Sequence, residues 1–370
     1  MGLITNRVRK VTGIFDELSL DFVVLVNTAN ISYFTGIDSG LMLVIDRFLN
    51  TTLIVPRLDY QRVKDAVGAE ISKLIGYTTV EVPQRRHDEE LFVSKELGDY
   101  LLRGLELKPS NIVGIDNVGS PVAKELSSAG VRVIDINDKI LGIREVKDED
   151  EVRLIEEASR ITEEALDRVL KMGLEGRREN DVAAVLYKEM ISNGADDVAF
   201  KPIVASGPNG AYPHHSFTGR VIRRGEFVTI DVGAKYHLYC TDMTRTVSVG
   251  QVSKELRDMA LAVFEAYKKA VSHVRPGVKA SEVDSIAREV LSEYGYGQYY
   301  IHSTGHGVGV EVHEKPAISP SSNEELRANF VITIEPGVYI KGVGGVRIED
   351  TILITDSGSR PLSKYPIYLF

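Results

Sequence analysis

The first 140 or so residues alternate short apolar runs with segments of helical periodicity. The runs 21–26, 40–46 and 51–56 are rich in β-branched residues and end at turn residues, which predicts strands. Segments 57–67 and 94–105 carry apolar residues at helical spacing, which predicts helices. Alternation of this kind predicts an α/β domain.

The pattern changes at residues 141–151, where charged side chains are concentrated. A long helical repeat follows, with apolar residues spaced by three and four from Leu154 to Val169. We therefore predict a domain boundary here, with one domain over residues 1–143 and a second over residues 144–370.

The second half combines long helices with long strands. Helices are predicted at 181–193, 253–274 and 281–295. Strands are predicted at 226–236, 244–250, 330–340 and 344–355. Helices grouped with long strands, which we expect to be antiparallel, predict an α+β layer fold.

Composition excludes several classes of function. A net charge of −9 argues against nucleic-acid binding, and the sequence contains no apolar run long enough to span a membrane. The start of the chain lacks the apolar core of a signal peptide. The single cysteine, Cys240, excludes an internal disulfide and fits a reducing cytoplasm; we expect it to be a small core residue.

Four acidic residues lie in or beside apolar strand segments: Asp231, Asp242, Glu335 and Glu349. One such acid would be read as a capped or salt-bridged structural residue. Four in one half of the chain, all near glycine or sharp turns, favour a metal site, because buried carboxylates are unfavourable unless they are paired or bind a cation. With His306 they predict a site for two divalent cations.

The ligand types narrow the choice of metal. Mostly oxygen with one imidazole suits Mn²⁺, Co²⁺, Fe²⁺ or Zn²⁺, and we prefer Mn²⁺ or Co²⁺. The stretch HEKPA is not the helical zinc motif, because position 317 is alanine where that motif has its second histidine. Between His306 and His313, glycines are expected to let the backbone pass close to the cations.

Four stretches resemble the signature blocks of the pita-bread metallopeptidases: TIDVGAKYHLYCTDMTRT, STGHGVGVEVHEKP, TIEPGVYI and GGVRIEDT. That family includes Xaa-Pro aminopeptidase, Xaa-Pro dipeptidase (prolidase) and methionine aminopeptidase. The resemblance implies a C-terminal pita-bread fold preceded by an N-terminal α/β domain of the creatinase type. Methionine aminopeptidases usually lack that first domain, so the proline-specific branch is favoured.

The resemblance also implies the roles of the five ligands. Asp231 would bind one cation, and Asp242 and Glu349 would bridge both. His306 and Glu335 would complete the second cation's ligands. Glu335 would also act as general base towards a hydroxide that bridges the cations.

Further side chains match family positions. His214 resembles a histidine that contacts substrate near the metals, with His215 as the alternative. By the same resemblance, His302 and His313 would hydrogen-bond the scissile carbonyl or the leaving proline.

Two more residues match positions of the family. Arg347 resembles an arginine that steadies a ligand carboxylate, and on a strand its side chain would share a face with that of Glu349. Tyr339 resembles an active-site tyrosine, and a core aromatic is an equal alternative.

Three classes of function remain open: a metal-dependent Xaa-Pro peptidase, a protein-binding module and a metal-free hydrolase of the creatinase type. We favour an Xaa-Pro aminopeptidase over a dipeptidase, because prolidases commonly carry an arginine where this chain has Ala317; Lys315 or a residue of the first domain could replace it. A protein-binding module or a metal-free hydrolase of the creatinase type is disfavoured, because all five ligands are present. The substrates would be proline-containing peptides, and the resemblance implies a homodimer.

Overall fold

The structure is a computed structural model that describes residues 2–81, 84 and 87–367. The chain forms two compact units, Met1–Arg144 and Glu145–Phe370. In the described part of the chain, none of the helices has the length and apolar composition of a membrane span.

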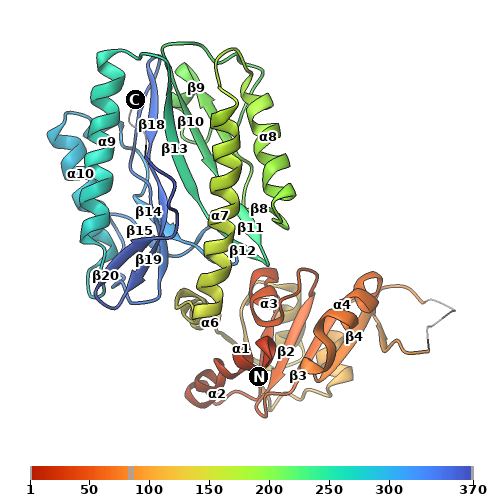
Figure 1. Cartoon of the computed structure of the whole chain (residues 1–370). Helices are drawn as coiled ribbons and strands as arrows, with labels where there is room; N and C mark the ends of the chain where they lie inside the picture. The colour runs from red at the N-terminus through yellow and green to blue at the C-terminus, as the bar shows by residue number, and fades with distance from the viewer. Residues whose placement is uncertain (1, 82–83, 85–86, 368–370) are drawn as a thin grey trace. The chain divides into compact units, whose positions relative to one another are not determined.

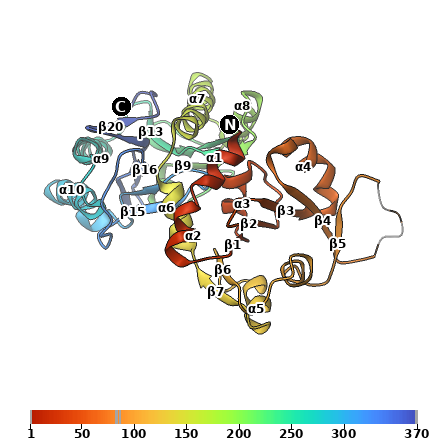
Figure 2. The ribbon, with the colours of Figure 1, turned by 90° about the horizontal axis from the view of Figure 1, so that it is seen from below.

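The first unit is built on a seven-stranded sheet. Its strands are β1 (Phe22–Leu25), β2 (Met42–Asp46), β3 (Thr51–Pro56), β4 (Lys73–Thr78), β5 (Leu91–Val93), β6 (Ile112–Ile115) and β7 (Arg132–Asp135). Their order is β5-β4-β3-β2-β1-β6-β7, which the labels of Figure 2 follow. The β1–β2 and β2–β3 pairs are antiparallel and the others parallel. The three predicted strands are β1, β2 and β3.

The helices of this unit connect or precede the strands. They are α1 (Leu3–Arg9), α2 (Thr12–Leu18), α3 (Thr28–Thr35), α4 (Tyr60–Val67), α5 (Pro121–Ser128) and α6 (Asn137–Glu145). The helix predicted at 94–105 is wrong over most of its length: only a π-helical segment at Tyr100–Gly104 forms. Gly98 and Gly104 explain the difference, because glycine is among the poorest helix formers.

In the second unit, two helices cover one three-stranded sheet. Helix α7 (Glu149–Lys171) begins with a capping box between Asp148 and Glu151. With α8 (Glu179–Ser192) it shares an apolar core with β9 (Ile203–Ser206), β10 (Glu226–Val232) and β13 (Met243–Val249). Figure 1 shows both helices beside these strands.

Another pair of helices, α9 (Lys254–His273) and α10 (Ala280–Glu293), shares a second core with the C-terminal strands. The C-terminal sheet contains β14 (Gly305–Gly307), β15 (Glu314–Ile318), β16 (Val331–Ile334), β19 (Asp350–Thr355) and β20 (Gly358–Pro361), in the order β15-β14-β16-β19-β20. A hairpin of β17 (Gly337–Ile340) and β18 (Gly344–Arg347) stands apart from this sheet. A small sheet joins β8 (Asp197–Val198), β11 (Ala234–Tyr236) and β12 (Tyr239–Cys240).

Two predicted strands are each broken in two. Segment 330–340 divides into β16 and β17 at Glu335 and Pro336, and segment 344–355 divides into β18 and β19 at Ile348 and Glu349. Proline removes a backbone donor, which accounts for the first break. Both breaks place an acidic side chain where the backbone changes sheet.

Candidate metal centre

Strand pairing around Thr244 brings three acids together. Asp231 lies opposite Thr244 in the β10–β13 ladder. Glu349 forms an isolated bridge with the same residue, and its backbone N–H donates to the Thr244 carbonyl at 3.1 Å. Asp242 directly precedes β13. Three acids that are distant in sequence therefore become neighbours.

His306 and Glu335 are held by adjoining strands. The Glu335 N–H donates to the Thr304 carbonyl at 2.8 Å, and the His306 N–H donates to Thr333 Oγ1 at 3.1 Å. A Cβ on Gly305 would lie 2.0 Å from the Thr333 carbonyl oxygen, and one on Gly307 2.0 Å from that of Lys315. These glycines thus permit close packing of β14 on its neighbouring strands, and the expected approach of backbone to cations stays a prediction.

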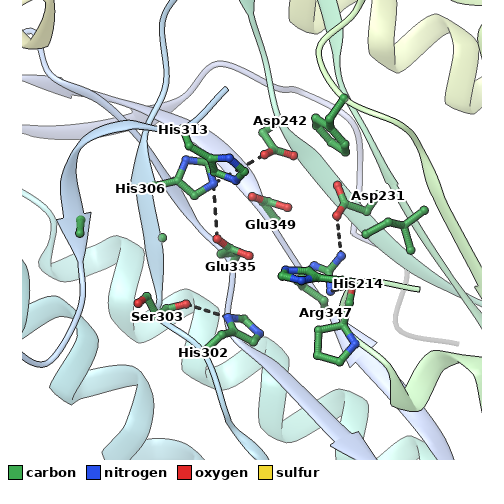
Figure 3. A pocket seen from close by; sticks show the side chains of 15 residues that line it. His214, Asp231, Asp242, His302, Ser303, His306, His313, Glu335, Arg347 and Glu349 are labelled. Carbon is green, nitrogen blue, oxygen red and sulfur yellow. Dashed lines mark hydrogen bonds and ion pairs between the residues drawn. The ribbon is translucent and has the colours of Figure 1, made fainter. Parts of the chain in front are cut away.

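The five side chains converge on one cavity (Figure 3). Potential ligand atoms of Asp242, His306 and Glu349 all lie within 4.8 Å of one another. His306 Nε2 lies 3.7 Å from Asp242 Oδ2 and 3.5 Å from Glu335 Oε1. This spacing suits groups that share a cation.

The tautomer of His306 supports that interpretation. Its Nδ1 lies 3.0 Å from the Gly307 carbonyl, which only accepts, so Nδ1 carries the proton. Burial lowers the pKa of His306 to about 4, so the ring is neutral. Nε2 therefore directs a lone pair at two carboxyl groups, an arrangement that a cation between them would stabilise.

Three buried carboxylate oxygens lack a hydrogen-bond partner among the described residues: Asp231 Oδ1, Asp242 Oδ1 and Glu349 Oε1. Burial and the negative charge of neighbouring acids raise the pKa values of Asp242 and Glu349 well above the ordinary range. Burial likewise raises the pKa of Glu335 to about 8. Oxygen donors with no protein partner fit a divalent cation, which would satisfy them and offset their charge.

Arg347 is the buried cation beside this cluster. Its Nη2 donates to Asp231 Oδ2 at 2.5 Å, and its Nη1 donates to Tyr339 Oη at 2.9 Å. Tyr339 in turn lies 2.9 Å from His302 Nε2. Because His302 Nδ1 faces the Ser303 carbonyl at 2.8 Å, both its ring nitrogens are engaged by protein, and its predicted contact with substrate stays a prediction.

The remaining histidines divide into two sets. His214 and His313 line the cavity, and the His313 ring lies edge-on to that of His306 with centroids 4.4 Å apart. His215 does not line it: its Nε2 lies 3.2 Å from the buried carboxylate of Glu179. The geometry favours His214 over His215 as the residue that meets substrate.

The cavity has a volume of about 370 Å³. Its walls include residues that we did not predict, among them Phe200, Ile203 and Pro213. A signal existed for Ile203, which begins an apolar strand and pairs with Asp231. These three and Ala317 are apolar residues of the cavity lining.

Two family profiles match this chain. Residues 153–356 match "Metallopeptidase family M24", and residues 7–146 match "Creatinase/Prolidase N-terminal domain". Together they account for both compact units.

Individual relatives match over nearly the whole chain. An Xaa-Pro dipeptidase from Pyrococcus furiosus is 38% identical over 361 residues, which cover 97% of this chain and 98% of the relative. The crystal structure of the prolidase from Pyrococcus horikoshii OT3 has a TM-score of 0.85 at 36% identity, covering 99% of this chain and 100% of that one. The X-Pro aminopeptidase from Thermotoga maritima has a TM-score of 0.86 at 31% identity, covering 98% and 99%.

Proposed function

The chain belongs to metallopeptidase family M24, and on this premise we propose that it is an Xaa-Pro dipeptidase that binds two divalent cations. Family membership makes it a metallo-exopeptidase and confirms the predicted architecture, a creatinase-type N-terminal domain followed by a pita-bread catalytic domain. The number of cations and their identity, with Mn²⁺ or Co²⁺ preferred, are part of the proposal.

The choice of dipeptidase reverses the preference drawn from Ala317. Two relatives that match over 97% and 98% of this chain, at 38% and 37% identity, are named Xaa-Pro dipeptidase. These names support the alternative interpretation better than the aminopeptidase that the sequence favoured. One missing arginine is weak evidence, because a carboxylate can be recognised by more than one arrangement of donors.

The observation that carries the proposal is the set of buried, unpartnered carboxylate oxygens of Asp231, Asp242 and Glu349, acids that line the same cavity as His306. Asp231, Asp242, His306, Glu335 and Glu349 would hold the cations. A bound divalent cation supplies Lewis-acid polarisation and lowers the pKa of water.

The chain's own groups supply the proton transfer. Glu335 lines the same cavity as the histidines. It would accept a proton from the attacking water and release it to the proline nitrogen. That nitrogen needs a proton to leave, because the Xaa-Pro bond is a tertiary amide with no N–H. His214 and His313, which line the same cavity, would hydrogen-bond the scissile carbonyl oxygen.

The apolar residues of the cavity wall would account for a preference for proline in the substrate. Phe200, Ile203, Pro213 and Ala317 lie on the same cavity as the carboxylates. A pyrrolidine ring is rigid and apolar, so it would lose little conformational freedom on binding there.

The second candidate is the Xaa-Pro aminopeptidase, and one observation favours it. Among the described residues that line the cavity, Arg347 alone carries a permanent positive charge, and it is committed to Asp231 and Tyr339. A dipeptide's own carboxylate would therefore have no unengaged guanidinium or ammonium group of the cavity wall to meet, whereas a longer peptide has no carboxylate at that point.

A cleavage panel distinguishes the two. We expect the Mn²⁺- or Co²⁺-loaded protein to cleave Xaa-Pro dipeptides with a kcat/KM at least about tenfold above that for the matching Xaa-Pro-Yaa tripeptides. The variant Ala317→Arg should widen this ratio by supplying a guanidinium. Equal or faster cleavage of tripeptides by the natural sequence would support the aminopeptidase instead, and cleavage of neither would contradict both.

Three further expectations stay predictions: the homodimer, the cytoplasmic location and the individual roles of the site residues.

A further inference from the structure

Glu179, at the start of α8, is a buried carboxylate outside the cavity. Its side chain is 0% exposed. Oε1 accepts from the Ser206 N–H at 2.8 Å, from Ser206 Oγ at 2.7 Å and from Asn209 Nδ2 at 2.9 Å. One oxygen thus binds the beginning of segment 206–218.

The other oxygen binds the end of the same segment. Glu179 Oε2 accepts from the Thr218 N–H at 3.0 Å and from Thr218 Oγ1 at 2.6 Å. His215 Nε2, at 3.2 Å, must donate to it, because an ionised carboxylate only accepts. A single side chain therefore gathers four residues that span the whole segment.

The opposite side of the segment packs on β18. A Cβ on Gly210 would lie 2.9 Å from Gly345 N, and one on Gly345 would lie 1.9 Å from the Gly210 carbonyl oxygen, so the two backbones are in direct contact. Arg347 Nη1 also lies 3.4 Å from the Pro213 carbonyl oxygen. The segment is consequently held between Glu179 and the strand that carries Arg347.

Two side chains of this segment, Pro213 and His214, line the cavity. His214 is exposed, and the structure gives it no hydrogen bond or ion pair to another described residue. Its place therefore depends on the backbone of the segment rather than on contacts of its own ring.

We propose that Glu179 is a positioning residue that fixes segment 206–218 and so holds Pro213 and His214 in place for substrate. The inference rests on the proposed function, in which those two residues meet the Xaa-Pro unit. The two adjacent histidines then have separate tasks: His215 anchors the segment to Glu179, and His214 faces substrate.

The variant Glu179→Gln tests this with the smallest change of shape. An amide has one accepting oxygen and one donating nitrogen, so the nitrogen must face either the Ser206 donors or the Thr218 donors and repel them. Glu189→Gln is the matched control, because Glu189 lies on the same helix and its side chain pairs with the exposed Lys188. Thr218→Val is a milder second variant, which removes the 2.6 Å hydrogen bond to Glu179 and the 3.1 Å bond that Thr218 Oγ1 accepts from the Arg220 N–H, and it serves if Glu179→Gln does not fold.

The first readout is a double-mutant cycle with His214→Ala on an Xaa-Pro dipeptide, with the metal content of each variant measured alongside. We expect Glu179→Gln to lower kcat/KM by about 10- to 100-fold in the natural background and by less than about threefold in the His214→Ala background. Bound metal per chain should be unchanged. An equal loss in both backgrounds, or a loss explained by missing metal, would overturn the inference.

The second readout does not depend on activity, so it separates this inference from the proposed function. Hydrogen exchange of the amides of residues 207–217 should be faster in Glu179→Gln and Thr218→Val than in the natural protein and in Glu189→Gln. Unchanged exchange in both variants would refute the positioning role even if the enzyme cleaves Xaa-Pro peptides. Faster exchange in a protein that cleaves no such peptide would support the anchoring while refuting the proposed function.

Discussion

Glu349 and Asp350 are adjacent, equally buried acids with opposite surroundings. Asp350 Oδ1 accepts from Arg245 Nη2 at 2.8 Å, and Oδ2 accepts from Tyr267 Oη at 2.5 Å. Glu349 accepts one side-chain hydrogen bond, from Thr244 Oγ1 at 2.6 Å, and its Oε1 has no partner in the described part of the chain. Both carboxylate oxygens of Asp350 therefore have partners within the protein, whereas one oxygen of Glu349 has none among the described residues.

Strand geometry explains how neighbours come to differ so much. Side chains alternate between the two faces of a strand, so Glu349 lines the cavity, whereas its neighbour Asp350 does not and pairs with Arg245 instead. Behind the strands, a buried acid is paired as buried charges normally are. On the cavity side, several acids are left with unpaired oxygens and raised pKa values, which is the arrangement expected where a cation completes the site.

The largest effect on activity should follow from substituting an acid on the cavity side of the strands. Glu349→Gln replaces a ligand oxygen by an amide nitrogen that cannot bind a cation, so we expect kcat/KM on Xaa-Pro substrates to fall by at least about 100-fold. Bound metal per chain should fall in parallel, which elemental analysis of the purified protein measures. Thr244→Ser keeps the hydroxyl that donates to Glu349 and should retain both metal and activity. A Glu349→Gln protein with full metal content and normal rates would contradict the predicted ligand role.

The corresponding acid-to-amide substitution at Asp350 should lower stability rather than metal binding. Asp350→Asn weakens the buried pair with Arg245, and we expect it to lower the free energy of unfolding by about 3 kcal/mol. Urea unfolding of metal-free protein measures this value.

Urea unfolding of metal-free Glu349→Gln gives the comparison with Asp350→Asn. In metal-free protein it replaces a buried carboxyl whose ionisation is disfavoured by burial and by the nearby acids Glu335 and Asp231. We therefore expect it to raise the free energy of unfolding, by about 1 kcal/mol. Equal losses from the two variants would show that the two acids are alike, and the contrast drawn between the two faces would fail.

The acids of the cavity were predictable from sequence because their context is local. Asp231, Glu335 and Glu349 each stand in or beside an apolar strand, next to glycine, proline or a turn, and the motifs around them resemble those of one family. Strand alternation also placed Arg347 with Glu349, and both line the cavity. What the sequence did not reveal is that the strands break at Glu335 and Glu349, because an apolar run does not indicate where a backbone changes sheet.

Glu179 could not be predicted. Its partners lie 27 to 39 residues later, in a segment with no regular periodicity, and only the fold brings them to one carboxylate. In sequence it is one more acid at the start of a helix, which the macrodipole alone explains. The sequence could not decide between His214 and His215 for the same reason. Two adjacent histidines differ only in the residues that the fold brings next to each of them.

The smallest predicted effect concerns Glu145, a buried acid between these extremes. Its Oε2 lies 3.5 Å from Arg327 Nη2, so it is only partly paired. Burial and the negative charge of Glu324, opposed by Arg327, raise the pKa of Glu145 to about 7. A carboxyl whose pKa is raised in the folded state favours folding less as pH rises, so its penalty should be absent below about pH 4.5 and complete above about pH 7.

Glu145→Gln should therefore raise the free energy of unfolding by about 1 kcal/mol near pH 8 and change it little near pH 5. Urea unfolding of metal-free protein at the two pH values measures the difference, and the exposed Glu149→Gln is the control, with equal effects at both. A Glu145→Gln variant that is destabilised near pH 8 would mean that Arg327 pairs fully with Glu145, and that this acid belongs with Asp350 rather than between the two.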